Sequence, residues 1–70
     1  MAPAISALQA RRRRILEAAT ELFVGAPYET VQMDDVAKAA QVAKPTVYRH
    51  FGTKEALFRE VIDEALAALK

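Results

Sequence analysis

Apolar residues recur at helical spacing in the first third of the chain. Four of them stand at i, i+4, i+7 and i+8 and so share one helical face: Ile15, Ala19, Leu22 and Phe23. This pattern predicts a helix from about Leu8 to Val24. Gly25 and Pro27 follow it, and because proline biases the preceding Ala26 away from helical angles, we expect the helix to end by about Gly25.

A shorter helical pattern follows and then breaks. Four apolar residues repeat the i, i+3, i+4, i+7 spacing: Met33, Val36, Ala37 and Ala40. The pattern breaks near Gln41, and we expect a third helix from about Lys44 to Phe51. Pro45 is tolerated in its first turn, where an amide would lack an intrahelical partner anyway. Val47 and Phe51, four residues apart, should face the core.

A fourth helix is expected from Lys54 onward, with Thr53 as its N-cap. It is apolar on two sides. One stripe holds Leu57, Val61, Ala65 and Ala68, and the other holds Phe58, Ile62, Leu66 and Leu69. A three-helix bundle can cover only one of them, so the second stripe implies a partner surface, either more of the same chain or another subunit. The predicted fold class is all-α: a three-helix bundle followed by a fourth, linker helix.

Length and composition narrow the class of protein. Seventy residues make at most one small domain, and without cysteine it has neither a disulfide framework nor a thiolate metal site. The N-terminal stretch lacks the order of a secretory signal, and no segment approaches the roughly 20 apolar residues that span a bilayer. We therefore expect a soluble, cytoplasmic protein that is held together by helix packing.

The charges are unevenly distributed, although the net charge is only +1. The formal charges between positions 38 and 54 are all positive: Lys38, Lys44, Arg49 and Lys54. The segment that follows is mainly acidic, with Glu55, Glu60, Asp63 and Glu64 against Arg59 and Lys70. A protein with this polarity can present one end to a polyanion.

Two short helices joined by a tight turn, the second of them basic, describe a helix-turn-helix, whose second helix enters the DNA major groove. Here the sequence resembles the N-terminal DNA-binding domain of the tetracycline-repressor (TetR) family. The resemblance runs from about Arg11 to Ala65. Its most specific part is a tyrosine followed by His-Phe and then Thr-Lys-Glu, which are Tyr48, His50, Phe51, Thr53, Lys54 and Glu55.

The resemblance implies a homeodomain-like bundle in which the second and third helices read DNA. It also implies a larger ligand-binding and dimerising domain, which is absent from this chain, and repression of transcription until a small molecule releases the DNA. We place a flexible N-terminal arm at residues 1–10 and the DNA-binding domain at 11–70. The expected partners are a near-palindromic DNA operator and a second copy of the full-length protein; a small-molecule effector is expected only in the full-length protein, and no cofactor or membrane is expected.

Carried over by position, the resemblance implies DNA contacts for ten residues: Lys44, Pro45, Thr46, Tyr48, Arg49, His50, Lys54, Gln32, Arg11 and Arg14. Lysine can donate to guanine O6 and N7, and proline and tyrosine can pack on thymine methyl groups or sugars. Lys54 would join the first amides of its helix in holding a phosphate. Tyr48 lies about 100° round the helix from Val47, which places it away from the core.

Simpler readings exist for the same residues. Lys44 and Arg49 could be solvated side chains, and His50 could make a structural hydrogen bond; as the only histidine, it is a poor metal site. The run from Arg11 to Arg14 cannot all face one way on a helix, so at most two of its members should meet DNA. The aromatic residues Phe23, Tyr28, Phe51 and Phe58 are expected in the core.

Three departures from the family pattern stand out. Pro27 replaces a glycine that usually ends the first helix. Gln41 replaces a glycine of the turn, and it should take a left-handed conformation at a cost on the order of 1 kcal/mol. Gln32 and Ala43 replace Ser or Thr helix caps, each loss costing about 1 kcal/mol.

Other classes of function fit the sequence less well. An enzyme would need a nucleophile or acid-base group in a pocket, yet the chain has one serine, Ser6 near its start, one histidine and no cysteine. We expect no catalytic activity. A small basic helical module that binds a protein or an anionic membrane surface is the better rival, because basic amphipathic helices are typical of both.

Overall fold

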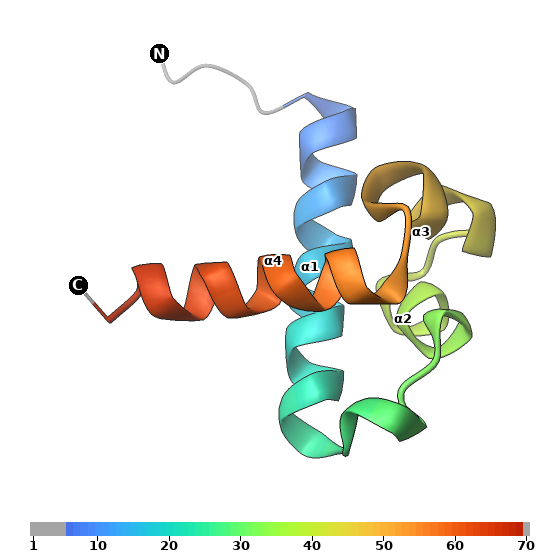
Figure 1. The fold of residues 1–70 in the computed structure, drawn as a ribbon. Helices are drawn as coiled ribbons and strands as arrows, with labels where there is room; N and C mark the ends of the chain where they lie inside the picture. Colours follow the sequence, from blue (N-terminus) through green and yellow to red (C-terminus); the bar gives the residue numbers. More distant parts are fainter. Residues whose placement is uncertain (1–5, 70) are drawn as a thin grey trace, which may run out of the picture.

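The computed structural model of the chain describes residues 6–69 as a bundle of helices. Along the chain these are α1 (Ala7–Gly25), a short 3-10 turn η1 (Tyr28–Thr30), α2 (Met33–Ala40), α3 (Lys44–Phe51) and α4 (Lys54–Ala67). In Figure 1, α2 and α3 lie together on one side of α1, and α4 crosses α1 at a steep angle. The far end of α4 projects beyond α1, away from the α2 and α3 side. The all-α fold class is confirmed.

The core draws on every α-helix. Its buried apolar side chains are Ile15, Leu16, Ala19, Val31, Met33, Val36, Ala37, Ala40, Val47, Phe51, Leu57 and Val61. The largest fully buried ones come one from each helix: Ile15, Val36, Val47 and Leu57. The predicted apolar faces of the four α-helices therefore pack into one common core, and this packing fixes the position of α3 relative to the other helices.

The start of α1 agrees with the helix predicted from about Leu8 and not with a flexible arm that extends to residue 10. Residues 7–10 form the first turn of α1. The reason is a capping box, in which the Ser6 hydroxyl accepts from the Gln9 amide at 3.1 Å and the Gln9 side chain accepts from the Ser6 amide at 3.2 Å. Residues 1–5 of the expected arm lie outside the described residues.

The end of α1 is set by proline. The last helical residue is Gly25, as predicted, and Ala26 is extended at φ −154° and ψ 156°. The pyrrolidine ring of Pro27 disfavours helical angles at Ala26, so the helix cannot continue. Gly25 does not adopt the positive φ that glycine tolerates. Among the described residues, only Gln41 and Gly52 have a positive φ.

The turn between α2 and α3 keeps a Schellman motif without glycine. Gln41 has φ 61° and ψ 44°, which confirms the predicted left-handed conformation. The amide of Val42 donates to the Ala37 carbonyl at 3.0 Å, and the amide of Gln41 donates to the Lys38 carbonyl at 3.2 Å. The carbonyls of Ala37 and Lys38 in the last turn of α2 therefore have partners, and Gln41 carries the conformational cost.

The turn between α3 and α4 is a tight one centred on Gly52, around which the Thr53 amide donates to the Phe51 carbonyl at 2.9 Å. Gly52 takes φ 82° and donates its amide to the Tyr48 carbonyl at 2.8 Å. Thr53 then caps α4, because its hydroxyl accepts from the Ala56 amide at 3.0 Å. The predicted N-cap is confirmed, and the cap fixes where Lys54 begins α4.

An acidic residue adds a different hydrogen bond at the start of α2, where the Ser or Thr cap is missing. The Asp35 carboxylate accepts a hydrogen bond from the Gln32 amide at 3.0 Å. A carboxylate at a helix N-terminus is also favoured by the helix dipole. Ala43, in contrast, gives α3 no side-chain cap, so that part of the expected cost remains.

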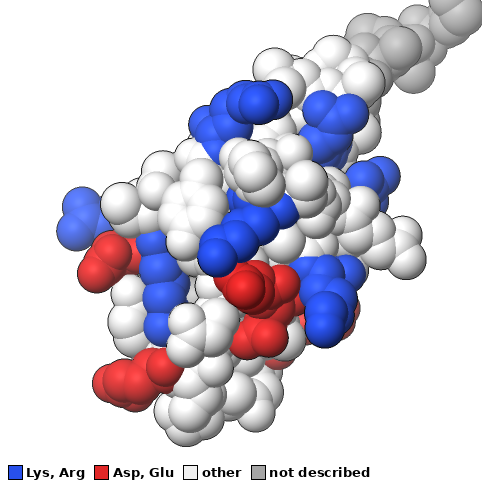
Figure 2. All heavy atoms as spheres, turned by 90° about the vertical axis from the view of Figure 1, so that its right-hand side faces the viewer, with Lys and Arg blue, Asp and Glu red and all other residues white. Residues whose placement is uncertain are grey.

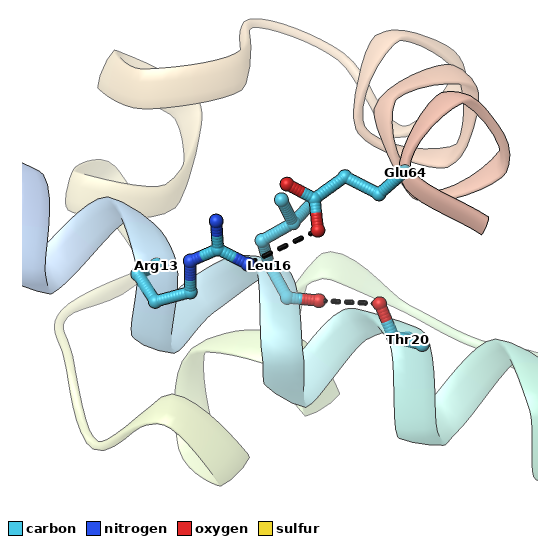
Figure 3. Close-up of polar contacts among 4 residues, drawn as sticks. All are labelled: Arg13, Leu16, Thr20 and Glu64. Atoms are coloured by element: carbon cyan, nitrogen blue, oxygen red, sulfur yellow. Dashed lines mark hydrogen bonds and ion pairs between the residues drawn. The ribbon is translucent and has the colours of Figure 1, made fainter. Parts of the chain in front are cut away.

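Ion pairs join α1 to α4. Arg12 pairs with Glu60, and Arg13 pairs with Glu64 at 3.0 Å, as the upper dashed line in Figure 3 shows. The lower dashed line marks Thr20, whose hydroxyl donates to the Leu16 carbonyl at 2.8 Å within α1. Exposed pairs of this kind contribute about 0–1 kcal/mol each. They occupy two of the four arginines in the run that begins α1.

The second apolar stripe of α4 stays uncovered over most of its length. Phe58 is half-buried, whereas Ile62, Leu66 and Leu69 are 41%, 58% and 81% exposed. We call the last three the outer stripe of α4; Leu69 lies two residues beyond the last residue of the helix, Ala67. The bundle buries Leu57 and Val61 of the first stripe, and the stripe's last two alanines lie beyond it.

Candidate nucleic-acid interface

One face of α3 packs against the core and the other is exposed to solvent. Val47 is fully buried and Phe51 nearly so, which confirms that they hold α3 to the core. Tyr48 is 42% exposed, and Lys44, Pro45 and Arg49 are exposed as well. Because α3 has only eight residues, about two turns, it has one buried face and one face exposed to solvent.

Lys44 is the first residue of α3, and it already has a partner. Its ammonium lies 2.7 Å from the Asp34 Oδ1 atom at the start of α2. The hydrogen bond from Lys44 to Asp34 and the charge of that carboxylate raise the pKa of Lys44 above its ordinary value. The lysine is therefore fully charged at neutral pH and is held beside α2.

Lys54, at the first turn of α4, lies on an aromatic ring. Its ammonium stands 4.1 Å from the centroid of the Tyr28 ring, within the range of a cation–π contact. Burial, followed by the charges of Glu55 and Glu29, raises the pKa of the Tyr28 hydroxyl above its ordinary value, so the ring stays neutral beneath the lysine. The long side chain of Lys54 is thus supported in the half-buried position that it occupies.

The tyrosine belongs to a cluster that corrects the expected core. Phe23, Tyr28 and Phe58 are half-buried, and their ring centroids lie 5.7 Å, 4.9 Å and 4.9 Å apart in pairs. Only Phe51 of the four predicted core aromatics is buried. The other three come from α1, η1 and α4, and they form a half-buried cluster at the edge of the core, against which Phe23 packs.

His50 lies half-buried among cations. Burial lowers the pKa of its imidazole below the ordinary value, and the charges of Arg11, Arg12 and Arg49 lower it further. The imidazole is therefore neutral at pH 7 in the free chain. An added anion would reverse this balance, because it would stabilise the protonated ring.

Arg14 and Arg11 differ in their surroundings. The Arg14 Nε atom donates to the Ala40 carbonyl at 3.3 Å, so this side chain helps to close the C-terminal end of α2. Arg11 is exposed and lies near enough to His50 to affect its titration. Gln32 is exposed just before α2, and Thr46 is half-buried in α3. The DNA contacts of these residues stay predictions.

The structure brings most of the predicted residues to the side formed by α2 and α3. Figure 2 looks at this side and shows lysine and arginine side chains spread over it, with acidic side chains among them. The surface is therefore a mixture of charges. No helix within residues 6–69 is long and apolar enough to cross a membrane.

Two contributors were not identified from the sequence. Asp34 was assigned no role at the site, and Tyr28 was expected in the core, yet each holds a lysine that was predicted to meet DNA. Their partners are 10 and 26 residues away in the chain. No local spacing signal could have paired them.

Comparison with known proteins agrees with the geometry. The family described as "Bacterial regulatory proteins, tetR family" matches residues 15–61. The chain is 45% identical over 60 residues to the uncharacterized HTH-type transcriptional regulator YhgD of Bacillus subtilis, which covers 86% of this chain and 31% of the relative.

Two further relatives carry a stated mode of regulation. The transcriptional activator FasR of Mycolicibacterium smegmatis is 42% identical over 52 residues, covering 74% of this chain and 24% of that protein. The transcriptional repressor KstR of Rhodococcus jostii is 47% identical over 49 residues, covering 70% and 23%.

The chain thus spans less than a third of the length of these relatives. None of the solved structures matches it significantly. The relatives are transcriptional regulators, which confirms the expectation that the chain is not an enzyme. Since the family match covers most of the chain and contains both helices of the helix-turn-helix, the chain belongs to the tetR family of bacterial regulatory proteins and forms an N-terminal DNA-binding domain of that family.

Proposed function

We propose that the chain binds double-stranded DNA in a sequence-specific manner, as the operator-binding domain of a ligand-responsive transcriptional repressor. The observation that carries this proposal is the division of α3. Its inner face is locked to the core by Val47 and Phe51, while Lys44, Pro45 and Tyr48 face solvent. A short, rigidly held helix with such an outer face fits the width of the major groove.

Lys44 would read bases in this arrangement. The ammonium can donate to guanine O6 and N7, which is the commonest specific contact in the major groove. Pro45 and Tyr48 would pack beside it on thymine methyl groups or sugars. These contacts carry sequence information because they depend on the edge of each base pair.

The remaining residues would fix the register on the phosphates. Lys54 stands at the first turn of α4, where free amides and the helix dipole favour an anion, and the Tyr28 ring holds its ammonium there. Thr46, Arg49 and His50 would contact the backbone from α3. Such contacts set the position of the protein and contribute to affinity for every sequence.

The features of the whole protein are extensions of this proposal. Relatives about three times as long support a larger parent protein, in which a further domain would dimerise and bind an effector. Two recognition helices related by two-fold symmetry would then read a near-palindromic operator in successive major grooves, about 34 Å apart. A cytoplasmic protein bound in this way would repress by occupying its operator; repression is the direction of regulation named for the Rhodococcus relative.

A paired titration tests the proposal against its main rival. The chain is added to a fluorescent duplex of about 30 base pairs, enough for two half-sites, and separately to anionic lipid vesicles. Saturable binding to the duplex that weakens steeply between about 50 and 200 mM salt, with weak or no binding to vesicles, is the expected result. Tighter binding to vesicles than to any duplex would overturn it and favour a membrane-surface module.

A further inference from the structure

An ion pair spans the two helices of the helix-turn-helix. Asp34 is the second residue of α2 and Lys44 the first of α3, and the carboxylate and ammonium are 2.7 Å apart. Both side chains are more than half exposed, at 67% and 52%. Exposed pairs of this kind contribute little to folding. The position of the pair, at the point where α3 would enter the groove, therefore calls for a different explanation.

We propose that Asp34 is a specificity-determining residue. It restrains the Lys44 side chain so that the ammonium donates hydrogen bonds to guanine in preference to phosphate. The inference rests on the proposed function, in which Lys44 reads bases. Asp34 contacts no base in this scheme; it acts through the lysine.

The donor capacity of the ammonium supports this role. A lysine ammonium has three N–H donors and no acceptor. Asp34 takes one donor through its Oδ1 atom, so two remain, and guanine offers two acceptors, O6 and N7, on its major-groove edge. Lys44 can therefore read guanine without leaving Asp34.

The charge of the carboxylate acts on non-specific binding. Affinity for random DNA comes mainly from cations that neutralise phosphates. Asp34, only 2.7 Å from the Lys44 ammonium, offsets the positive charge that more distant phosphates experience, and its carboxylate itself repels phosphates. It thus weakens binding to all DNA, and it weakens binding least where Lys44 gains two hydrogen bonds from guanine. A group that disfavours the wrong partner more than the right one raises specificity.

The chain offers a matched control at the next position. Asp35 has the same charge as Asp34, but its carboxylate accepts from the Gln32 amide at 3.0 Å, and no contact with Lys44 is found. Asp35→Asn and Asp34→Asn remove the same charge from the same turn of α2. The side-chain oxygen of an asparagine at position 35 can still accept the hydrogen bond from the Gln32 amide. Only Asp34→Asn removes the ionic partner of Lys44.

The test compares two duplexes of equal length and base composition. One is the duplex that the wild-type chain selects from a random pool, and the other is a scrambled version of it. Fluorescence anisotropy gives the Kd of each for the wild type, Asp34→Asn, Asp35→Asn and Lys44→Ala, and for Asp34→Asn combined with Lys44→Ala. Circular dichroism checks that each variant is folded.

Asp34→Asn is expected to tighten binding to the scrambled duplex more than to the selected one. The Kd for the scrambled duplex divided by the Kd for the selected duplex should therefore fall by about threefold or more. Asp35→Asn should tighten both by a common factor and keep the ratio. In the Lys44→Ala background, Asp34→Asn should no longer change the ratio. Equal effects of the two asparagine variants on the ratio would overturn the role of Asp34. A wild-type chain without any sequence preference would instead overturn the proposed function.

Discussion

Replacing Gln41 with glycine should stabilise the chain. Gln41 holds φ 61° and ψ 44°, the left-handed region in which a side chain crowds the backbone. A non-glycine residue there costs about 1–2 kcal/mol, whereas glycine adopts these angles freely. The Gln41 side chain is exposed, and none of its hydrogen bonds would be lost, since the two bonds that close the turn are made by backbone amides.

The net gain is smaller than the relief of strain. Glycine also gains freedom in the unfolded chain, which offsets about 0.5–1 kcal/mol. The free energy of unfolding should therefore rise by roughly 0.5–1 kcal/mol. For a domain of this size that corresponds to an increase in Tm of roughly 2–8 °C.

Thermal and urea unfolding followed by circular dichroism measure this change. The control is Ala39→Gly, because Ala39 is also exposed and lies two residues earlier, in right-handed helix. That variant should lose about 0.5–1 kcal/mol. A Gln41→Gly variant with an unchanged or lower Tm would refute the reasoning, and so would an equal gain in the Ala39 control.

Other predictions concern DNA binding and assembly. Lys44→Ala should cost roughly 1–3 kcal/mol mainly on the selected duplex, whereas Lys54→Ala should weaken all duplexes alike and flatten the salt dependence in anisotropy titrations; equal losses on selected and random DNA for both would contradict base reading by Lys44. Tyr28→Leu should weaken binding two- to fivefold, about 0.5–1 kcal/mol, and Tyr28→Phe should not, because the ring face holds Lys54; similar losses in both variants would exclude the cation–π contact. Because the pKa of His50 is lowered in the free chain and a phosphate would raise it, binding should take up a proton and tighten as the pH falls from about 7.5 to 6, and His50→Gln should abolish this dependence; a His50→Gln variant with the same pH profile would assign it to another group. The same lowered pKa means that unfolding binds a proton, so the free chain should lose stability as the pH falls below the ordinary value of 6.5. In sedimentation at micromolar concentration the chain should be largely monomeric, and a stable dimer would show that the outer stripe of α4 already makes an interface.

Local chemistry accounts for what the sequence predicted correctly. Gly25 ends α1 because Pro27 acts on its immediate neighbour, and Thr53 caps α4 through a bond three residues away. The left-handed angles at Gln41 follow from the same logic, since a helix that turns back sharply needs such a residue. These rules operate within a few residues, so they can be read from the chain.

The prediction failed where distant segments meet or where a cap was overlooked. The apolar spacing placed the start of α1 near Leu8, but the capping box of Ser6 with Gln9, a local signal, was not recognised, and the flexible arm was drawn over the same residues. In contrast, the support of Lys54 by Tyr28 depends on how η1 packs against α4. The ion pair of Asp34 depends likewise on the angle between α2 and α3, which the spacing of apolar residues does not determine. Which side chains pair on the surface depends on how the helices pack. For this reason Asp34 and Tyr28, which contact predicted site residues, were not identified from the sequence.

The central claim is that α3 enters the major groove of DNA, and an NMR titration tests it most directly. The nitrogen-15-labelled chain is titrated with the duplex that it selects from a random pool, and amide shifts are followed residue by residue. The account predicts that the largest changes fall between Lys44 and Lys54, with little change along the outer stripe of α4. Changes concentrated on Ile62, Leu66 and Leu69, with α3 unaffected, would contradict it.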